Sequence, residues 1–144
     1  MSIAYVDIRF FAHATEDLDK VIEAVQNVLP AKYVDDILFK RDNLRGHYNN
    51  PIFLFETRIK KKEIAEAVVE NFSSRLGELD KKALHEEIDL HMQKGSLYIR
   101  VDKQAALQGE LKLCTTDAIR LRIRFKKAKT EDIVKMCQDL GILI

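Results

Sequence analysis

The feature that most constrains the fold is a seven-residue stretch, I-R-L-R-I-R-F, at residues 119–125. Apolar and basic residues alternate there without a break, and successive side chains of a β-strand point to opposite faces of the sheet. The stretch therefore predicts a strand with one apolar face and one face that carries Arg120, Arg122 and Arg124. Same-face neighbours lie about 7 Å apart. We expect the three guanidinium groups to form a row over a packed core, and such a row suits a polyanion.

The net charge of +1 conceals an uneven distribution of charge along the chain. The formal charges by segment are −3 for residues 1–30, +4 for 31–62, −4 for 63–95, +6 for 96–129 and −2 for 130–144. The positive segments are those that we interpret as strands and their loops, whereas the helices are acidic. If the strands share one sheet, one surface is basic, which is typical of nucleic-acid-binding proteins. A solvent-exposed charged face explains the same pattern without a ligand.

Length and composition indicate one globular domain over residues 1–144. A chain of this length buries about 68–70% of its unfolded surface, and 47% hydrophobic with 33% charged residues is typical of soluble proteins. No apolar run reaches the roughly 18 residues of a membrane span, and the N-terminus lacks the pattern of a secretory signal. We therefore expect a cytoplasmic protein.

Hydrophobic periodicity predicts strands and helices in mixed order. Alternation or short apolar runs indicate strands at residues 3–14, 33–40, 52–59, 97–102, 110–114 and 118–125. Helical spacing indicates helices from Thr15 to Pro30, at 63–76, at 80–92 and from Thr130 to Gly141, with a polar loop at 41–51 and a turn or single helical turn at 103–109. Regular βαβ spacing is missing. The expected fold is an α+β two-layer sandwich, a mainly antiparallel sheet with helices packed on one face.

Two lysine clusters precede predicted helices. Lys60, Lys61 and Lys62 lie where the helix macrodipole disfavours each cation by on the order of a few tenths of a kcal/mol. A phosphate bound jointly by the lysines and the exposed N–H groups would offset that cost. Neutralisation by nearby glutamates is an equally good explanation. Lys126 and Lys127 occupy a similar position before the last helix.

Two segments resemble the hallmark sequences of a family of small archaeal RNA-binding proteins. They are L-Y-I-R-V-D-K-Q-A-A-L-Q-G-E at residues 97–110 and R-G-H-Y-N-N-P-I at 45–52. That family is associated with the exosome as a predicted subunit, and its fold is likened to double-stranded-RNA-binding domains. The resemblance covers nearly the whole chain. It implies a compact α+β fold without a catalytic centre, structured or double-stranded RNA as ligand, and exosome or other RNA-processing proteins as partners. Asn49 stands where the family pattern has Gly, and Asn tolerates a left-handed backbone.

Carried onto this chain, the resemblance implies two groups of RNA contacts. The first segment contributes Arg100, Lys103 and Gln104, and the second contributes Arg45, His47, Tyr48 and Asn50. Alternatives exist for both groups. A structural pair between Asp102 and Arg100 would occupy that arginine, and Gly and Pro in the second segment are enough to explain it as a turn.

The sequence offers no motif for an enzyme or a metal centre. His85 and His91 are six residues apart, which is the wrong spacing for two ligands on one helical face. Cys114 and Cys137 form no cluster with metal-ligand spacing, and we expect buried free thiols. Phosphate-loop, dinucleotide-binding and nucleophile motifs are missing. We therefore predict no catalytic residue, no metal and no cofactor.

The combined prediction is a non-catalytic RNA-binding protein that recognises RNA backbone and shape through a basic sheet face. Tyr5, Arg9, Tyr98 and Arg100 are expected to join the arginine row, because Arg and Tyr together bind phosphates and stack on bases. The same residue types are enriched at protein interfaces. A protein–protein adaptor, or a homodimerisation module, whose basic face docks an acidic partner is therefore the alternative.

Overall fold

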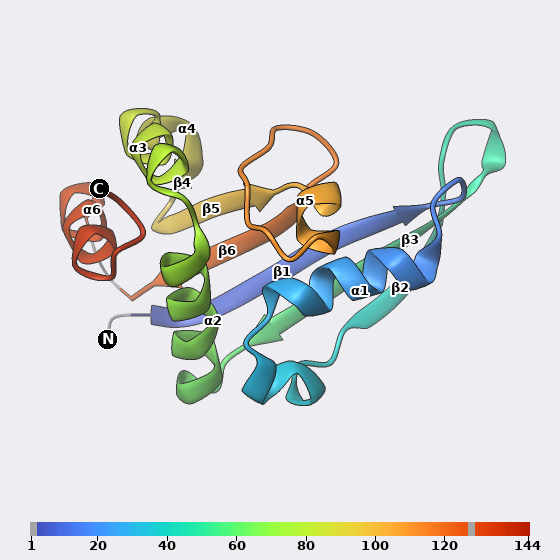
Figure 1. The fold of residues 1–144 in the computed structure, drawn as a ribbon, viewed down its shortest axis with the longest axis horizontal. Coiled ribbons are helices and arrows are strands. Elements are labelled where there is room, and N and C mark those ends of the chain that lie inside the picture. The colour runs from blue at the N-terminus through green and yellow to red at the C-terminus, as the bar shows by residue number, and fades with distance from the viewer. Residues whose placement is uncertain (1–2, 127–128) are drawn as a thin grey trace.

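The computed structural model describes residues 3–126 and 129–144 (Figure 1). Six strands form one sheet in the order β2-β3-β1-β6-β5-β4, and each neighbouring pair is antiparallel. Their bounds are β1 Ile3–His13, β2 Lys40–Arg45, β3 Pro51–Ile59, β4 Met92–Gln93, β5 Ser96–Val101 and β6 Ile119–Phe125. The predicted α+β architecture with a mainly antiparallel sheet is confirmed.

The helices cover one face of this sheet (Figure 1). Their bounds are α1 Leu18–Val28, α2 Lys62–Arg75, α3 Glu78–Glu86, α4 Ile88–His91, α5 Lys103–Leu107 and α6 Thr130–Asp139, with 3-10 turns η1 Ala31–Asp36 and η2 His47–Asn49. In Figure 1, α1 and α2 cross in front of the strands, and α5 lies beside α1. Over the described ranges, no helix combines the length and apolar character needed to cross a membrane.

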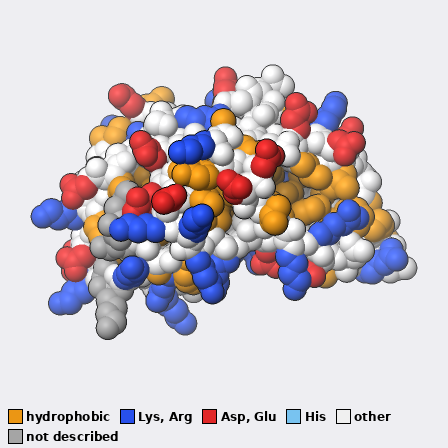
Figure 2. Space-filling model, turned by 90° about the horizontal axis from the view of Figure 1, so that it is seen from below, with side chains coloured by type: hydrophobic (Ala, Val, Ile, Leu, Met, Phe, Trp, Pro, Cys, Tyr) orange, Lys and Arg blue, Asp and Glu red, His pale blue; other side chains and the backbone are white. Residues whose placement is uncertain are grey.

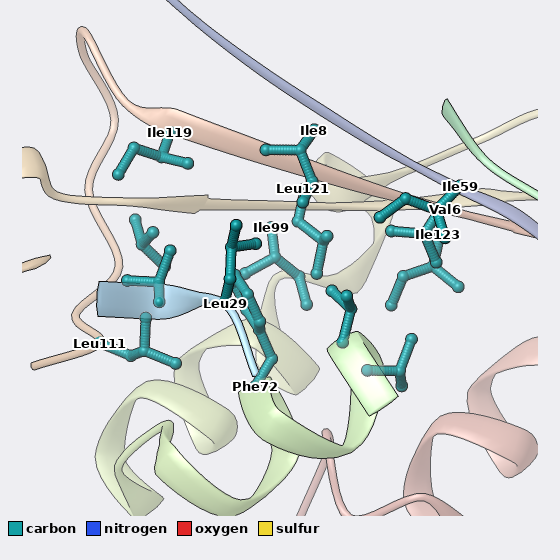
Figure 3. Packing of buried hydrophobic residues seen from close by; sticks show 14 of the residues in the cluster. Val6, Ile8, Leu29, Ile59, Phe72, Ile99, Leu111, Ile119, Leu121 and Ile123 are labelled. Atoms are coloured by element: carbon teal, nitrogen blue, oxygen red, sulfur yellow. The ribbon is translucent and has the colours of Figure 1, made fainter. Parts of the chain in front are cut away.

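The core forms where the apolar faces of the central strands meet the helix layer (Figure 3). Val6, Ile8, Leu121 and Ile123 project from β1 and β6, each at most 2% exposed, toward Phe72 of α2. Burying one such side chain stabilises the fold by about 1.5–3 kcal/mol. Buried and half-buried residues alternate along the whole of β6, so that its three half-buried arginines lie between four buried residues. The row of arginines therefore lies on the face away from the helices.

Most predicted elements are present, with shifted ends. The helix expected from Thr15 begins at Leu18, because the carboxylate of Asp17 accepts the N–H groups of Asp19 (3.0 Å) and Lys20 (3.4 Å) as N-cap. The predicted cap at Thr130 is wrong by one residue, since Lys129 is the N-cap and its side chain makes no capping hydrogen bond. After α6, the tail residues Ile142 and Leu143 pack into the core and are 0% and 3% exposed.

The strand predicted at residues 33–40 is wrong. Residues 31–36 form the turn η1, and the strand β2 occupies Lys40–Arg45, inside the predicted polar loop. β2 is an edge strand that pairs with β3 alone, and all its residues except Asp42 are exposed. An edge strand that is exposed to water needs no apolar alternation. Its polar sequence therefore carried no signal of a strand.

Two further predictions need correction. The strand expected at 110–114 is reduced to an isolated bridge between Leu113 and Val101, flanked by a hydrogen bond from Cys114 N–H to the Arg100 carbonyl (3.0 Å). The helix expected at 80–92 is broken at Glu87, whose φ and ψ of −107° and 27° leave the helical region. Residues 103–109, predicted as a turn or single helical turn, contain the five-residue helix α5.

Candidate nucleic-acid interface

The strand register assembles an array of arginines on the open face of the sheet. On β6, Arg120 pairs with Arg9 of β1 and Arg100 of β5, and Arg122 pairs with Asp7 and Tyr98. Directly paired residues of antiparallel strands project to the same side. We call this surface the arginine face and define it by Tyr5, Arg9, Arg58, Tyr98, Arg100, Arg120, Arg122 and Arg124. The sequence prediction that Tyr5, Arg9, Tyr98 and Arg100 join the row is confirmed.

The two tyrosines lie between the guanidinium groups. The guanidinium carbon of Arg58 is 4.0 Å from the ring centroid of Tyr5, and that of Arg122 is 5.7 Å from the rings of both Tyr5 and Tyr98. Arg120 and Arg100 lie 5.3 and 5.6 Å from the Tyr98 ring. Cation–π contacts of this kind contribute about 0.5–1 kcal/mol each at exposed sites. They hold the arginines in place without neutralising their charge.

One half of the arginine face has hydrogen-bond or ion-pair partners within the protein itself. Asp7 accepts two hydrogen bonds from Arg58, at 2.9 and 3.0 Å, and this pairing raises the pKa of Arg58. Arg122 donates to the Ser96 hydroxyl (3.0 Å) and lies 3.8 Å from Asp7. Arg124 donates to the carbonyl of Lys94. These arginines therefore already have partners in the free protein.

The other half, Arg9, Arg100 and Arg120, is not compensated. We call these residues the arginine triad. Within residues 3–126 and 129–144, no carboxylate lies within ion-pair distance of any of the three. The Arg120 Nε is buried without a hydrogen-bond partner, and burial, followed by the charge of Arg9, lowers the pKa of Arg120. Three like charges side by side destabilise the sheet, so a bound anion would be favourable here.

The charge asymmetry is visible at the surface. Figure 2 shows the molecule from below, with the helix layer above and the open face of the sheet below. Lys and Arg side chains gather along the lower rim in this view. Among the paired residues of β1, β3, β5 and β6, the open face of the sheet carries six arginines against two carboxylates, Asp7 and Glu56. A nearly neutral protein thus presents one distinctly basic surface.

Comparison with known proteins places the chain in a family. A family model described as RNA binding matches residues 5–125, the span from β1 to the end of β6. The chain belongs to this RNA-binding family. RNA-binding protein PAB1135 of Pyrococcus abyssi is 34% identical over 139 residues, which cover 93% of this chain and 90% of that protein.

Two similar proteins with solved structures have the same fold as this chain. Protein AF2318 from Archaeoglobus fulgidus is 27% identical and superposes with a TM-score of 0.81 over 96% of this chain and 99% of that chain. Mth689 from Methanothermobacter thermautotrophicus is also 27% identical, with a TM-score of 0.76 over 96% of this chain and 97% of that chain.

Lys103 is a predicted RNA contact, but its ammonium binds groups of the protein itself. Its side chain is 10% exposed, and the ammonium donates to the Phe11 carbonyl (2.6 Å), to Glu16 (3.1 Å) and to Asp117 (3.0 Å). The charge is therefore already compensated, and we leave Lys103 out of the interface. Gln104 is exposed on α5 beside residues of α1, in the helix layer, and it is also left out.

The charged cluster around Lys103 was missed by sequence reasoning. Its carboxylates and its imidazole come from Glu16, Asp117 and His13, and His13 Nε2 lies 3.0 Å from Asp117. Burial alone would raise the pKa of Asp117, but hydrogen bonds with Lys103 and His13 outweigh burial and lower it. The donor atoms of the three residues are close enough to hold a metal ion. The Lys103 ammonium already supplies the positive charge, so the cluster acts as a structural ion-pair network.

The alternative that Asp102 pairs with Arg100 is not what the structure shows. The Asp102 carboxylate accepts the N–H of Ala105 at 2.8 Å and serves as N-cap of α5. No ion pair joins Asp102 to Arg100 in the described part of the chain. Arg100 is therefore left available on the arginine face.

The second hallmark segment forms the tip of the β2–β3 hairpin, which projects beyond the sheet (Figure 1). Tyr48 is 95% exposed, and Tyr48 and Asn49 have φ angles of 57° and 62°. The expectation that Asn49 takes a left-handed conformation is confirmed. Arg45 donates to the Asn49 carbonyl (3.3 Å), and Asn50 accepts from Gly46 N–H (2.8 Å), so both residues also stabilise the turn. The backbone of His47 begins η2.

The described lysines of the two clusters follow the ends of β3 and β6. Lys60, Lys61 and Lys62 are exposed at the start of α2, where Lys62 lies 4.0 Å from Glu66. This contact agrees with local neutralisation for Lys62. Lys126 is exposed directly after β6, and Lys127 lies outside the described residues. The structure thus brings the strand arginines together on one face of the sheet, while the described lysines follow the strand ends and the hairpin segment forms the tip of β2–β3.

Proposed function

We propose that the protein binds RNA through the arginine face, with guanidinium groups on backbone phosphates and the rings of Tyr5 and Tyr98 available for bases. The observation that carries this proposal is the uncompensated arginine triad, which places three unneutralised cations on one rigid surface. Guanidinium groups match phosphate oxygens with two parallel hydrogen bonds. Membership of the RNA-binding family supports RNA as the anion.

The cellular role that we propose is a non-catalytic one in archaeal RNA processing or exosome-linked decay. The protein would recognise the shape and backbone of structured or double-stranded RNA, with the hairpin residues Arg45, His47, Tyr48 and Asn50 as a second contact. Its archaeal relatives include a protein named as RNA-binding, which supports the first part of this role. Co-purification of the tagged protein with exosome subunits, resistant to ribonuclease, would test the second part.

The direct test compares two charge-matched double variants. Arg100→Gln with Arg120→Gln removes two members of the arginine triad, and Lys20→Gln with Lys82→Gln removes two exposed lysines from helices α1 and α3. Both variants lose the same net charge. Affinity for a labelled RNA hairpin should fall at least tenfold, on the order of 1.4 kcal/mol, for the first variant only. Both variants should have the same melting temperature as the wild-type protein.

The alternative of an acidic protein partner gives a different outcome. Polyglutamate carries negative charge but no phosphate and no base, so it should compete poorly with RNA. If polyglutamate displaces RNA at equal charge concentration, the arginine face is a general acidic-partner surface and the RNA proposal is wrong. If both double variants lose RNA affinity equally, net charge and not the arginine face decides binding, and the proposal is wrong as well.

A further inference from the structure

A hollow of about 360 Å³ opens on the arginine face at the arginine triad. Residues of β1, β5, β6 and the segment before β6 line it, chiefly Arg9, Phe11, His13, Arg100, Asp117 and Arg120. Its volume lies within the range of about 300–1,000 Å³ that is typical of small-molecule sites. Cationic, aromatic and acidic side chains line the hollow, and these three types together suit one class of ligand.

The first wall of the hollow is cationic. All three residues of the arginine triad line it, and none has a carboxylate partner in the described ranges. The Nε of Arg120 is buried and has no hydrogen-bond acceptor among the described residues. A buried donor without an acceptor destabilises the free protein. A phosphate group is the anion whose several oxygens would satisfy such a set of donors together.

The second wall is aromatic. Phe11 follows Arg9 on the same face of β1, and the Arg9 guanidinium carbon lies 5.9 Å from the Phe11 ring centroid. The His13 ring continues this surface, with centroids 6.4 Å apart and planes inclined by 27°. Both rings are partly accessible. A flat aromatic surface next to a phosphate site is suited to a nucleobase, because stacking accepts every base.

The third side is polar and rigid. The Asp117 carboxylate is held by Lys103 and His13, both at 3.0 Å, and it lines the hollow. A carboxylate accepts hydrogen bonds from a ribose hydroxyl or from an exocyclic amine of a base. It also repels a second phosphate, which limits the site to one nucleotide unit.

We propose that this hollow holds a single unpaired nucleotide of the bound RNA, with its phosphate on the arginine triad and its base against Phe11. This inference rests on the proposed function and narrows its ligand to RNA with a bulged or single-stranded nucleotide. A base inside a continuous duplex is stacked on both faces and presents only its edges in the grooves, whereas an unpaired base can be splayed out onto an aromatic side chain. The hollow therefore distinguishes unpaired from paired positions.

The experiment compares two RNA hairpins that differ by one bulged adenosine in the stem. The wild-type protein should bind the bulged hairpin at least tenfold more tightly. Phe11→Ala should abolish this preference and keep the affinity for the perfect hairpin within about twofold, which corresponds to about 0.4 kcal/mol. Phe11→Tyr keeps an aromatic ring and should keep the preference. With 2-aminopurine as the bulged base, its fluorescence should be quenched on binding to the wild type.

Several results would overturn this inference. Equal affinity of the wild type for both hairpins, or unchanged 2-aminopurine fluorescence in the complex, excludes the nucleotide pocket even if RNA binds well. Binding to neither hairpin rejects the proposed function as well. If adenosine monophosphate binds more tightly than the bulged hairpin, the ligand is a free nucleotide. Because the fluorescence test uses the wild-type protein, the result does not depend on whether Phe11→Ala folds.

Discussion

At the scale of single residues, Lys103 shows how a buried charge is balanced. Its ammonium contacts two carboxylates and a carbonyl that come from β1, the start of α1 and the segment before β6. Replacing Lys103 by Met removes the cation and leaves Glu16 and Asp117 facing each other. Their side chains are 27% and 46% exposed, so water can partly solvate them. We expect a loss of about 1–3 kcal/mol in the free energy of unfolding, below the value for a fully buried pair.

Urea denaturation of Lys103→Met at neutral pH measures this loss. Lys112→Met is the matched control, because Lys112 is 65% exposed and its ion-pair partner is the exposed Glu110 at 3.2 Å. The control should lie within about 0.5 kcal/mol of the wild type. A Lys103 variant as stable as the control would show that the cluster does not stabilise the fold.

The same cluster predicts how stability depends on pH. The pKa of Asp117 in the folded protein is below its ordinary value of 3.8. At a pH near 3.8, the folded state therefore binds fewer protons than the unfolded state. The stabilisation is complete above the unfolded pKa and is lost as pH falls through the lower folded pKa. Melting temperatures between pH 6 and 2.5 should therefore fall less for Asp117→Asn than for the wild type, starting from a lower value at pH 6. Parallel curves for the two proteins would contradict this.

At the scale of secondary-structure elements, the end of α6 depends on one backbone conformation. Gly141 has φ of 80°, and a Cβ there would lie 2.8 Å from the Ser73 Oγ of α2. That hydroxyl donates to the Leu140 carbonyl at 2.6 Å and ties α6 to α2. Gly141→Ala combines a left-handed backbone with this clash, so we expect a loss of about 1–3 kcal/mol.

The control for this substitution is Gly77→Ala. Gly77 has φ of −68°, and a Cβ there would meet no atom within 4 Å. Thermal unfolding should place Gly77→Ala close to the wild type, within about 1 kcal/mol, and Gly141→Ala clearly below it. Similar melting temperatures for both variants would mean that the α6–α2 contact is weak.

At the scale of the whole molecule, the basic face predicts salt-dependent RNA binding. If the arginine triad contributes three phosphate contacts, the logarithm of the association constant should fall with the logarithm of salt concentration with a slope of about −2 for unpaired RNA. This corresponds to roughly 20-fold weaker binding between about 50 and 200 mM salt. Fluorescence anisotropy at several salt concentrations measures the slope.

The variants separate this effect from general charge. Arg100→Gln with Arg120→Gln should reduce the magnitude of the slope by about 1.4, since two phosphate contacts are lost. The control Lys20→Gln with Lys82→Gln should keep the wild-type slope. A slope near zero in the wild type would show that the arginine face holds no phosphates.

Local patterns were sufficient for much of the fold. The alternation at 119–125 predicted β6 and the side on which its arginines lie, and apolar periodicity located β1, β3, α1 and α2. These elements are each amphipathic or apolar enough for a period to appear in the sequence. The sequence does not reveal β2, because an edge strand exposed on both faces has no such period. It predicts α3 and α4 as one helix, because the break at Glu87 has no Gly or Pro signal.

The alternation at 119–125 is enough to place three arginines on one strand face, because side-chain direction in a strand depends only on neighbours along the chain. Which cations remain without carboxylate partners depends on how distant strands pair. Asp7 reaches Arg58 and Arg122 through cross-strand pairing, whereas Arg9, Arg100 and Arg120 meet one another. Lys103 is neutralised by residues 87 and 14 positions away. Such pairings arise from register and packing between distant segments, and no local pattern of residues encodes them.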